Sequence, residues 1–313
     1  MTESRIRPRG VAVGFGVAVI AAATALAWLI SGGQLSPAMT GARAVADLAA
    51  SVCLGLALVP RLDQSRYRDE LTGRAAAPLA VAAAVWLVAE LTRVLLLAAE
   101  ISATALTRLS LPTLVDFAWS TAPGRAAVFS VVAAAAVCAL ALAAPRSPTT
   151  TVTVAGLATA GIAARAVTGH VSDGVLTSMS VVVHSLAAAL WFGTLAGLAL
   201  TVSARGQWAR VLPAFSRYAL PTVAVLVATG ALTALGALDS AAQLVQTGYG
   251  RVLLAKVAVT AVVLILAWAH RGGWLRAARS HRIGAQDSLR RSVVELALLT
   301  VALTLAAGLT VTG

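Results

Sequence analysis

Charged residues are scarce in this chain. Asp, Glu, Lys and Arg together make up 12% of its 313 residues, whereas a soluble domain contains about 25%. So few charges exclude a protein whose whole surface faces water. The alternating polarity of transmembrane β-barrel strands is also missing, because the apolar runs are continuous. The sequence therefore predicts an all-α membrane protein.

Cysteines and catalytic motifs are few or missing as well. The two cysteines, Cys53 and Cys138, lie within apolar runs, which favours buried free thiols and gives no disulfide framework. The chain contains no His-Glu-x-x-His motif, no phosphate-binding loop and no nucleophile beside a base. We therefore expect no enzymatic activity.

Acidic residues are outnumbered: 12 Asp and Glu stand against 24 Lys and Arg, for a net charge of +12. The basic residues lie mainly between apolar runs, where the positive-inside rule expects them on the cytoplasmic side of a membrane. The charge therefore indicates topology, and no nucleic-acid partner is expected.

Apolar residues are abundant: they make up 59% of the chain, and the mean hydropathy is +0.88. They form nine runs long enough to cross a bilayer, at about 11–30, 42–60, 75–100, 124–144, 150–170, 176–203, 218–238, 250–269 and 290–312. We expect a polytopic helix bundle, one integral domain over 1–313, in the lipid bilayer of the cell (cytoplasmic) membrane. Arginines in alternate loops place the N-terminus inside and the C-terminus outside.

Two stretches of this bundle need separate interpretation. Residues 1–30 resemble a signal sequence, but the apolar part is long and no clean cleavage site follows, so an uncleaved first helix is expected. The segment 101–123 is the one long outer connection. It predicts a short amphipathic helix at the outer interface, with Trp119 at the membrane surface.

A faint internal repeat runs through the chain. The motif Thr121-Ala-Pro-Gly124-Arg125 opens the fourth run, and a similar Thr-x-x-Gly-Arg opens the eighth; Leu-Ala-Ala followed by Gly55 in the second run matches Leu-Ala-Ala followed by Gly193 in the sixth. These matches predict two parallel four-helix repeats, 42–170 and 171–313, with 1–41 as an additional N-terminal helix. Transporters often bind their substrate between such repeats.

Several charged residues fall within the apolar runs, where a charge is costly unless it is paired or faces water. Arg43 and Asp47 are four residues apart, and Glu90 and Arg93 are three apart, so each pair shares a helix face. Two interpretations follow: ion pairs that hold the helices in register, or a polar cavity open to the outside. The remaining candidates for this charge network are Arg165, Arg251, Lys256 and Glu295.

Two of the four histidines, His170 and His184, flank a turn expected near Ser172-Asp173-Gly174. Such a histidine is either a hydrogen-bonded packing residue or a ligand for copper, zinc or haem iron. Met179 adds a soft thioether nearby, which slightly favours Cu(I). If the turn is centred near Thr177, the two histidines lie level and share one ion; if it is centred on Asp173-Gly174, they form an outer and a deeper site.

Three motifs resemble the membrane copper resistance protein D (CopD) family. They are Gly169-His170 followed by His184-Ser-Leu-Ala-Ala-Ala-Leu-Trp191-Phe-Gly193, then Thr247-Gly-Tyr-Gly250-Arg251-Val-Leu-Leu-Ala-Lys256, and last Arg291-Ser-Val-Val-Glu295-Leu. The similarity is strongest over about 165–312. Thr194 departs from it, since the family usually has a second Gly there. The resemblance implies an inner-membrane protein that moves copper, and actinobacterial relatives resemble fusions to a CtaG-like domain for copper insertion into cytochrome oxidase.

The expected function is copper import through an outward polar cavity lined by Arg43, Asp47, Glu90 and Arg93, with His170, His184 and Met179 as ligands. Lys256 and Arg251 would shape the electrostatic field of the cavity or neutralise Glu90 or Asp47. Glu295 would pair with Arg291 or form an inner gate. A periplasmic copper-binding protein or a CtaG-like domain would be a partner. Two alternatives stay open: a haem- or quinone-binding electron-transfer protein, and a copper-binding scaffold for oxidase assembly that does not transport.

Overall fold

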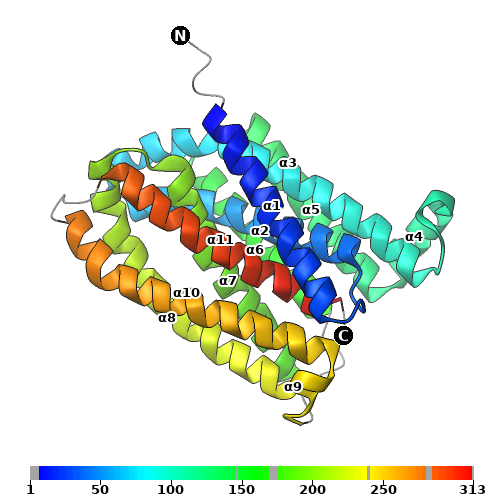
Figure 1. The fold of residues 1–313 in the computed structure, drawn as a ribbon. Coiled ribbons are helices and arrows are strands. Elements are labelled where there is room, and N and C mark those ends of the chain that lie inside the picture. Colours follow the sequence, from blue (N-terminus) through cyan, green and yellow to red (C-terminus); the bar gives the residue numbers. More distant parts are fainter. Residues whose placement is uncertain (1–6, 146, 169–174, 238–239, 280–283, 312–313) are drawn as a thin grey trace.

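The computed structural model describes residues 7–145, 147–168, 175–237, 240–279 and 284–311 (Figure 1). Within these ranges the chain forms helices and no strands. The helices are α1 (Arg7–Ile30), α2 (Pro37–Leu58), α3 (Arg68–Ile101), α4 (Leu111–Ser120), α5 (Ala122–Ala143), α6 (Pro148–Thr168), α7 (Val175–Thr201), α8 (Arg205–Gly236), α9 (Gln243–Gln246), α10 (Gly248–Arg279) and α11 (Ala285–Leu309). Short 3-10 turns follow α2 and α3, at Val59–Leu62, Ser65–Tyr67 and Leu106–Arg108.

Eight of these helices, α2, α3, α5, α6, α7, α8, α10 and α11, are long and apolar enough to span a membrane. The part of α1 from Gly14 to Ile30 is apolar but shorter. The predicted all-α polytopic membrane bundle is therefore confirmed. Several helices extend past the predicted apolar runs. The longest extensions are in α3, which already begins at Arg68, in α8, which begins at Arg205, and in α10, which continues to Arg279. Hydropathy marks only the part of a helix that suits lipid, and polar residues continue the same helix beyond it.

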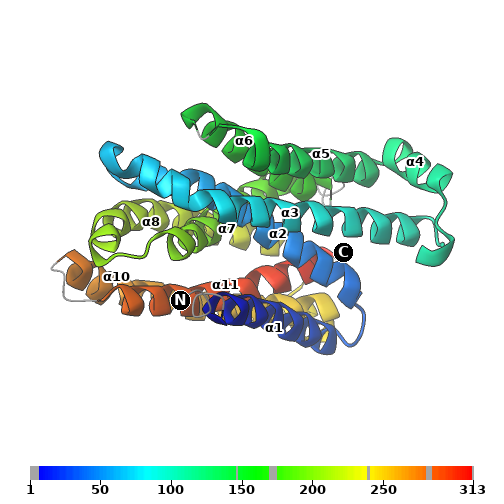
Figure 2. The same ribbon diagram turned by 90° about the horizontal axis from the view of Figure 1, so that it is seen from above.

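The segment 101–123, predicted as an outer connection, contains the expected short helix. α4 begins after Ser110, whose side chain accepts a hydrogen bond from the backbone N–H of Thr113, a common N-cap arrangement. Figure 2 shows α4 at one end of the bundle, beside α5. Trp119 is 68% exposed, as expected for a side chain at a membrane surface.

The long helices pack as two similar rings of four. In the first ring α2 packs on α3, α3 on α5, α5 on α6, and α6 on α2. In the second ring α7 packs on α8, α8 on α10, α10 on α11, and α11 on α7. The rings meet where α2 packs on α7, and α1 lies against α11 and α2. In Figure 2 the pair α5 and α6 lies on one side of the molecule, and α10, α11 and α1 lie on the other.

The short motifs matched in the sequence have the same local structure in both rings. Thr121 Oγ1 accepts a hydrogen bond from Gly124 N at 2.9 Å, and Thr247 Oγ1 accepts one from Gly250 N at 2.9 Å. A guanidinium N–H of Arg125 donates to the carbonyl six residues earlier, and Arg251 does the same. The division of the chain into two repeats stays a prediction that these parallels support.

Candidate functional site

A cavity of about 380 Å³ lies between the two rings. Its walls come from the first halves of α2, α7 and α10 and the last halves of α6, α8 and α11, so it occupies one half of the bundle. We call this the inter-ring cavity. Most of its lining is aliphatic, but five of its side chains carry or can carry charge: Arg43, Asp47, Arg165, His184 and Lys256.

Arg165 on α6 connects two carboxylates from two other helices. Its guanidinium pairs with Glu90 of α3, and its Nη2 lies 2.8 Å from Asp47 Oδ1 of α2. Glu90 is completely buried, and it also accepts hydrogen bonds from Trp86 Nε1 at 3.0 Å and from Arg93 Nη1 at 2.6 Å. This network ties α2, α3 and α6 together inside the first ring.

Both pairs predicted from helix spacing are present. Arg93 pairs with Glu90, and Arg43 Nε lies 3.8 Å from Asp47 Oδ2. The pairs fit the interpretation as structural ion pairs, and the opening of a polar cavity to the outside stays a prediction. Glu90 and Arg93 are buried behind the wall and act as structural ion pairs, whereas Arg43, Asp47 and Arg165 line the inter-ring cavity.

One of the two roles expected of Lys256 and Arg251 is wrong. They do not neutralise Glu90 or Asp47, because the arginines of α2, α3 and α6 do so. The other role, to shape the electrostatic field of the cavity, stays a prediction. Arg251 instead donates from Nε to Ile30 O at 2.6 Å, which ties the end of α1 to the start of α10. Arg251 and Lys256 belong to the second ring, whereas the two carboxylates and the arginines that pair with them belong to the first ring.

His184 projects from α7 into the inter-ring cavity. Its Nδ1 lies 3.0 Å from the carbonyl oxygen of Leu226 and 3.3 Å from Thr229 Oγ1, both on α8. A carbonyl can only accept, so Nδ1 carries the proton of the neutral ring and Nε2 keeps the lone pair. That Nε2 lies 3.5 Å from Lys256 Nζ on α10.

Gly230 makes room for this imidazole. A Cβ at that position would lie 2.9 Å from His184 Cε1, closer than carbon atoms normally approach. Gly230 was not among the site residues predicted from the sequence. The available signal was a glycine in the middle of an apolar run, which usually has a packing or functional reason.

Met179, one of the other two proposed ligands, is not brought to His184. Met179 lies five residues earlier on α7, which places it roughly 140° around the helix; it is 57% exposed and does not line the cavity. His170 lies outside the described residues. A turn centred near Thr177 is also wrong, because α7 already begins at Val175. Within the described ranges, no group of three or more His, Cys, Asp or Glu side chains is placed to hold a metal ion.

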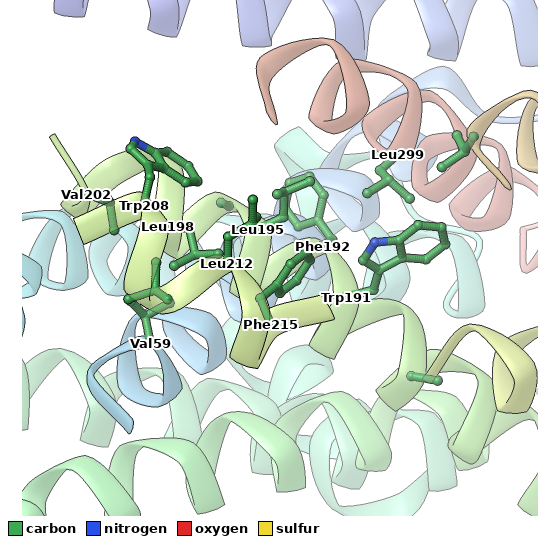
Figure 3. Close-up of a cluster of buried hydrophobic side chains, with 14 of the residues drawn as sticks. Val59, Trp191, Phe192, Leu195, Leu198, Val202, Trp208, Leu212, Phe215 and Leu299 are labelled. Atoms are coloured by element: carbon green, nitrogen blue, oxygen red, sulfur yellow. The ribbon is translucent and has the colours of Figure 1, made fainter. Parts of the chain in front are cut away.

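Trp191 is the last residue of α7 in the cavity wall, and it contacts Glu295 of α11, which is not part of that wall. Trp191 lines the cavity and donates from Nε1 to Glu295 Oε1 at 3.2 Å, which ties α7 to α11. Beyond Trp191 the half-bundle is filled by buried apolar side chains, among them Phe192, Leu195 and Phe215 (Figure 3). This packing closes the cavity on that side.

A polar contact lies at the opposite end of the bundle from the cavity. The buried Asp63 carboxylate, just after α2, accepts two hydrogen bonds from Arg210 of α8, at 2.9 and 3.0 Å. The Arg210 guanidinium also lies 3.9 Å above the ring of Tyr67, within the range of a cation–π contact. Next to it, Gln207 accepts from Arg74 and donates to Glu70. The first and second rings are therefore joined by paired charges at this end.

Two known family models match most of the chain. Residues 34–179 match the model described as copper resistance protein D-like, N-terminal domain, and residues 209–309 match the model described as copper resistance protein D. His184 and Trp191 lie between the two matched ranges. No curated protein and no solved structure matches the chain. The two matches, in chain order and over the two rings, show that this multi-pass membrane protein belongs to the copper resistance protein D family.

Proposed function

We propose that the protein imports copper across the cytoplasmic membrane through the inter-ring cavity. The observation that carries the proposal is the lone pair of His184 Nε2, which lies beside Lys256 and faces a cavity between two helix rings in a protein of a copper resistance family. Neutral imidazole is a good copper ligand, and transporters commonly bind their substrate between repeats.

The arginines support the side from which copper would enter in this proposal. The positive-inside rule places the loops after α2 and α7 in the cytoplasm, so the half that contains the inter-ring cavity is the outer one. Copper would enter this half from a periplasmic carrier. The packed side chains beyond Trp191 and the Asp63–Arg210 contact would have to separate before release to the inside. Trp191 and Glu295 would form part of that barrier.

Four residues of the cavity have roles in this proposal. His184 binds the metal, the Leu226 carbonyl and Gly230 hold its imidazole in place, and Arg165 fixes the first helix ring at the cavity wall.

Met179 was the argument for Cu(I) over Cu(II). Since it lies outside the cavity, the proposal covers copper in either oxidation state.

Uptake of radioactive copper into proteoliposomes tests the proposal. The wild type is compared with His184→Ala and with Met179→Leu, which alters an exposed side chain on the same helix. We expect uptake in the wild type and in Met179→Leu, and uptake close to that of empty liposomes in His184→Ala. Copper binding without uptake would instead support the scaffold for oxidase assembly. If the wild type neither binds nor takes up copper, a copper function for this cavity is overturned.

A further inference from the structure

The inter-ring cavity is larger and more apolar than a metal ion requires. Its volume of about 380 Å³ lies within the range of roughly 300–1,000 Å³ that is typical of sites for organic ligands. Most of its walls are aliphatic, with Ala188, Leu264, Leu299 and Leu303 among the lining residues. Water binds poorly in a space with such walls, whereas apolar molecules bind well. The cavity therefore suits an apolar ligand in addition to any ion at His184.

The cavity opens sideways between α8 and α10. Val227 and Ala231 of α8, and Val257 and Ala261 of α10, all line the cavity and are all exposed. Val227 is 47% exposed and Val257 is 55% exposed. In each helix the two residues are four apart, so they lie on one face. We call the gap between these four residues the lateral opening.

The other walls of the cavity are covered. Ile162 and Ala166 of α6, Ala189 of α7, and Leu299 and Ala307 of α11 also line the cavity, and each of them is buried. Exposed lining residues and buried ones therefore belong to different walls. This difference points to the α8–α10 side as the way in for an apolar ligand.

The helices beside the lateral opening lie at the edge of the bundle, next to each other (Figure 1). Of the eight candidate spans, α8 and α10 have the smallest buried shares, 6% and 17%. After Phe215, Leu226 is the only buried residue of α8. The described part of the chain has no further helix outside this pair. The lateral opening therefore faces the bilayer.

The lateral opening lies at the depth of the lipid acyl chains. Val257 and Ala261 are nine and thirteen residues from Gly248, the first residue of α10, which is roughly 14 and 20 Å along the helix. The two residues of α8 are nine and five residues before its last residue, Gly236, or roughly 14 and 8 Å. The hydrocarbon core of a bilayer is about 30 Å thick. At these depths the molecules next to the opening are hydrocarbon chains, and the headgroups lie nearer the helix ends.

We propose that the inter-ring cavity binds one acyl chain of a membrane phospholipid, which enters through the lateral opening while its headgroup stays in the leaflet. The chain lies along the aliphatic walls and reaches Leu299 and Leu303 of α11. Lipid tails are as apolar as these walls, so binding depends on van der Waals contacts with them. This site is independent of the proposed copper import.

Photolabelling with phosphatidylcholine that carries a diazirine in the middle of one acyl chain tests the site. The protein is reconstituted into vesicles that contain this lipid and irradiated, and the labelled residues are located by mass spectrometry. We expect label on Leu299 or Leu303, neither of which is exposed. Trp268 of α10, which is 79% exposed, should be labelled from the surrounding bilayer and serves as the internal reference.

Two substitutions narrow the lateral opening from its two sides. In Val257→Phe and in Ala231→Phe we expect the label on α11 to fall several-fold relative to that on Trp268. The matched control is Val262→Phe, which enlarges an exposed valine of α10 that does not line the cavity. It should leave the label on α11 as in the wild type. Elution of each variant as a single species, with Trp268 labelled as in the wild type, shows that the variants are folded in the bilayer.

Two results would overturn the acyl-chain site. One is the absence of label on α11 in the wild type, and the other is equal labelling of α11 in the wild type and in both variants of the lateral opening. Copper uptake is measured separately on the same vesicles. Label on α11 without copper uptake would keep the acyl-chain site and overturn the proposed function, and copper uptake without this label would do the reverse.

Discussion

Gly55 of α2 and Gly193 of α7 lie against each other's helix backbone where the two rings meet. A Cβ on Gly55 would strike the carbonyl of Gly193, and a Cβ on Gly193 would strike the carbonyl of Ser51. The contact is reciprocal, as expected when two similar helices cross at matching positions, and small residues commonly permit such close crossings in membranes. It brings Arg43 and Asp47 of α2 and His184 of α7 to the walls of one cavity.

Adding a methyl group at this crossing should weaken the bundle. Gly193→Ala forces α2 and α7 apart, and overpacking of this kind costs about 1–3 kcal/mol or more. We expect a clear fall in the thermal unfolding temperature in detergent. Gly156→Ala is the matched control, because no atom of another residue lies within 4 Å of the added Cβ. Equal stability of the two variants would contradict the tight crossing.

The buried carboxylate of Glu90 should be essential for folding. Glu90→Gln leaves Arg93 and Arg165 without their shared counter-charge, and removal of one partner of a buried pair costs about 3–5 kcal/mol. The control is Glu70→Gln, whose partner Arg74 is 38% exposed; exposed pairs contribute about 1 kcal/mol or less. Yield and thermal stability in detergent measure the difference. A Glu90→Gln variant as stable as Glu70→Gln would show that the network does not hold the first ring together.

The Asp63–Arg210 contact should keep the end opposite the cavity closed. Asp63→Asn removes the charge from a bidentate pair, so residues 59–67 and 205–212 should open more often. Hydrogen–deuterium exchange measures this opening, and we expect faster exchange in these two segments with little change at the cavity walls. Asp69→Asn, an exposed change of the same kind, serves as the control. Unchanged exchange in Asp63→Asn would mean that apolar packing alone closes this end.

The sequence predicted those parts of the site that depend on local geometry. The nine apolar runs follow from hydropathy, and the Arg43–Asp47 and Glu90–Arg93 pairs follow from the period of one helix. Contacts between helices were not predictable in this way. Nothing in the apolar pattern says which face of α6 meets α3, so the pairing of Arg165 with Glu90 was not foreseen. The same limit explains Arg251, which was expected in the cavity and instead ties α1 to α10.

The surroundings of His184 depend in the same way on three helices packing together. The sequence identified the histidine, because an imidazole in an apolar run is unusual. Its neighbours Leu226 and Lys256 lie 42 and 72 residues away along the chain. Met179 was selected because it is close in sequence, but five residues along a helix lead to a different face. Closeness in sequence therefore does not place two side chains on the same face of a helix unless the spacing is three or four.

Moving the imidazole without removing it gives the most selective test of the site. In Gly230→Ala the new methyl group would lie 2.9 Å from His184 Cε1, so the ring must turn and its Nδ1–H contact with the Leu226 carbonyl must lengthen. We expect copper uptake to fall several-fold in proteoliposomes while the protein stays folded. Gly236→Ala, on the same helix, is the control, because its Cβ would make only ordinary contact with Thr177, at 3.7 Å. If Gly230→Ala and Gly236→Ala transport copper equally well, the orientation of His184 does not matter, and the metal must be bound by other groups in the chain.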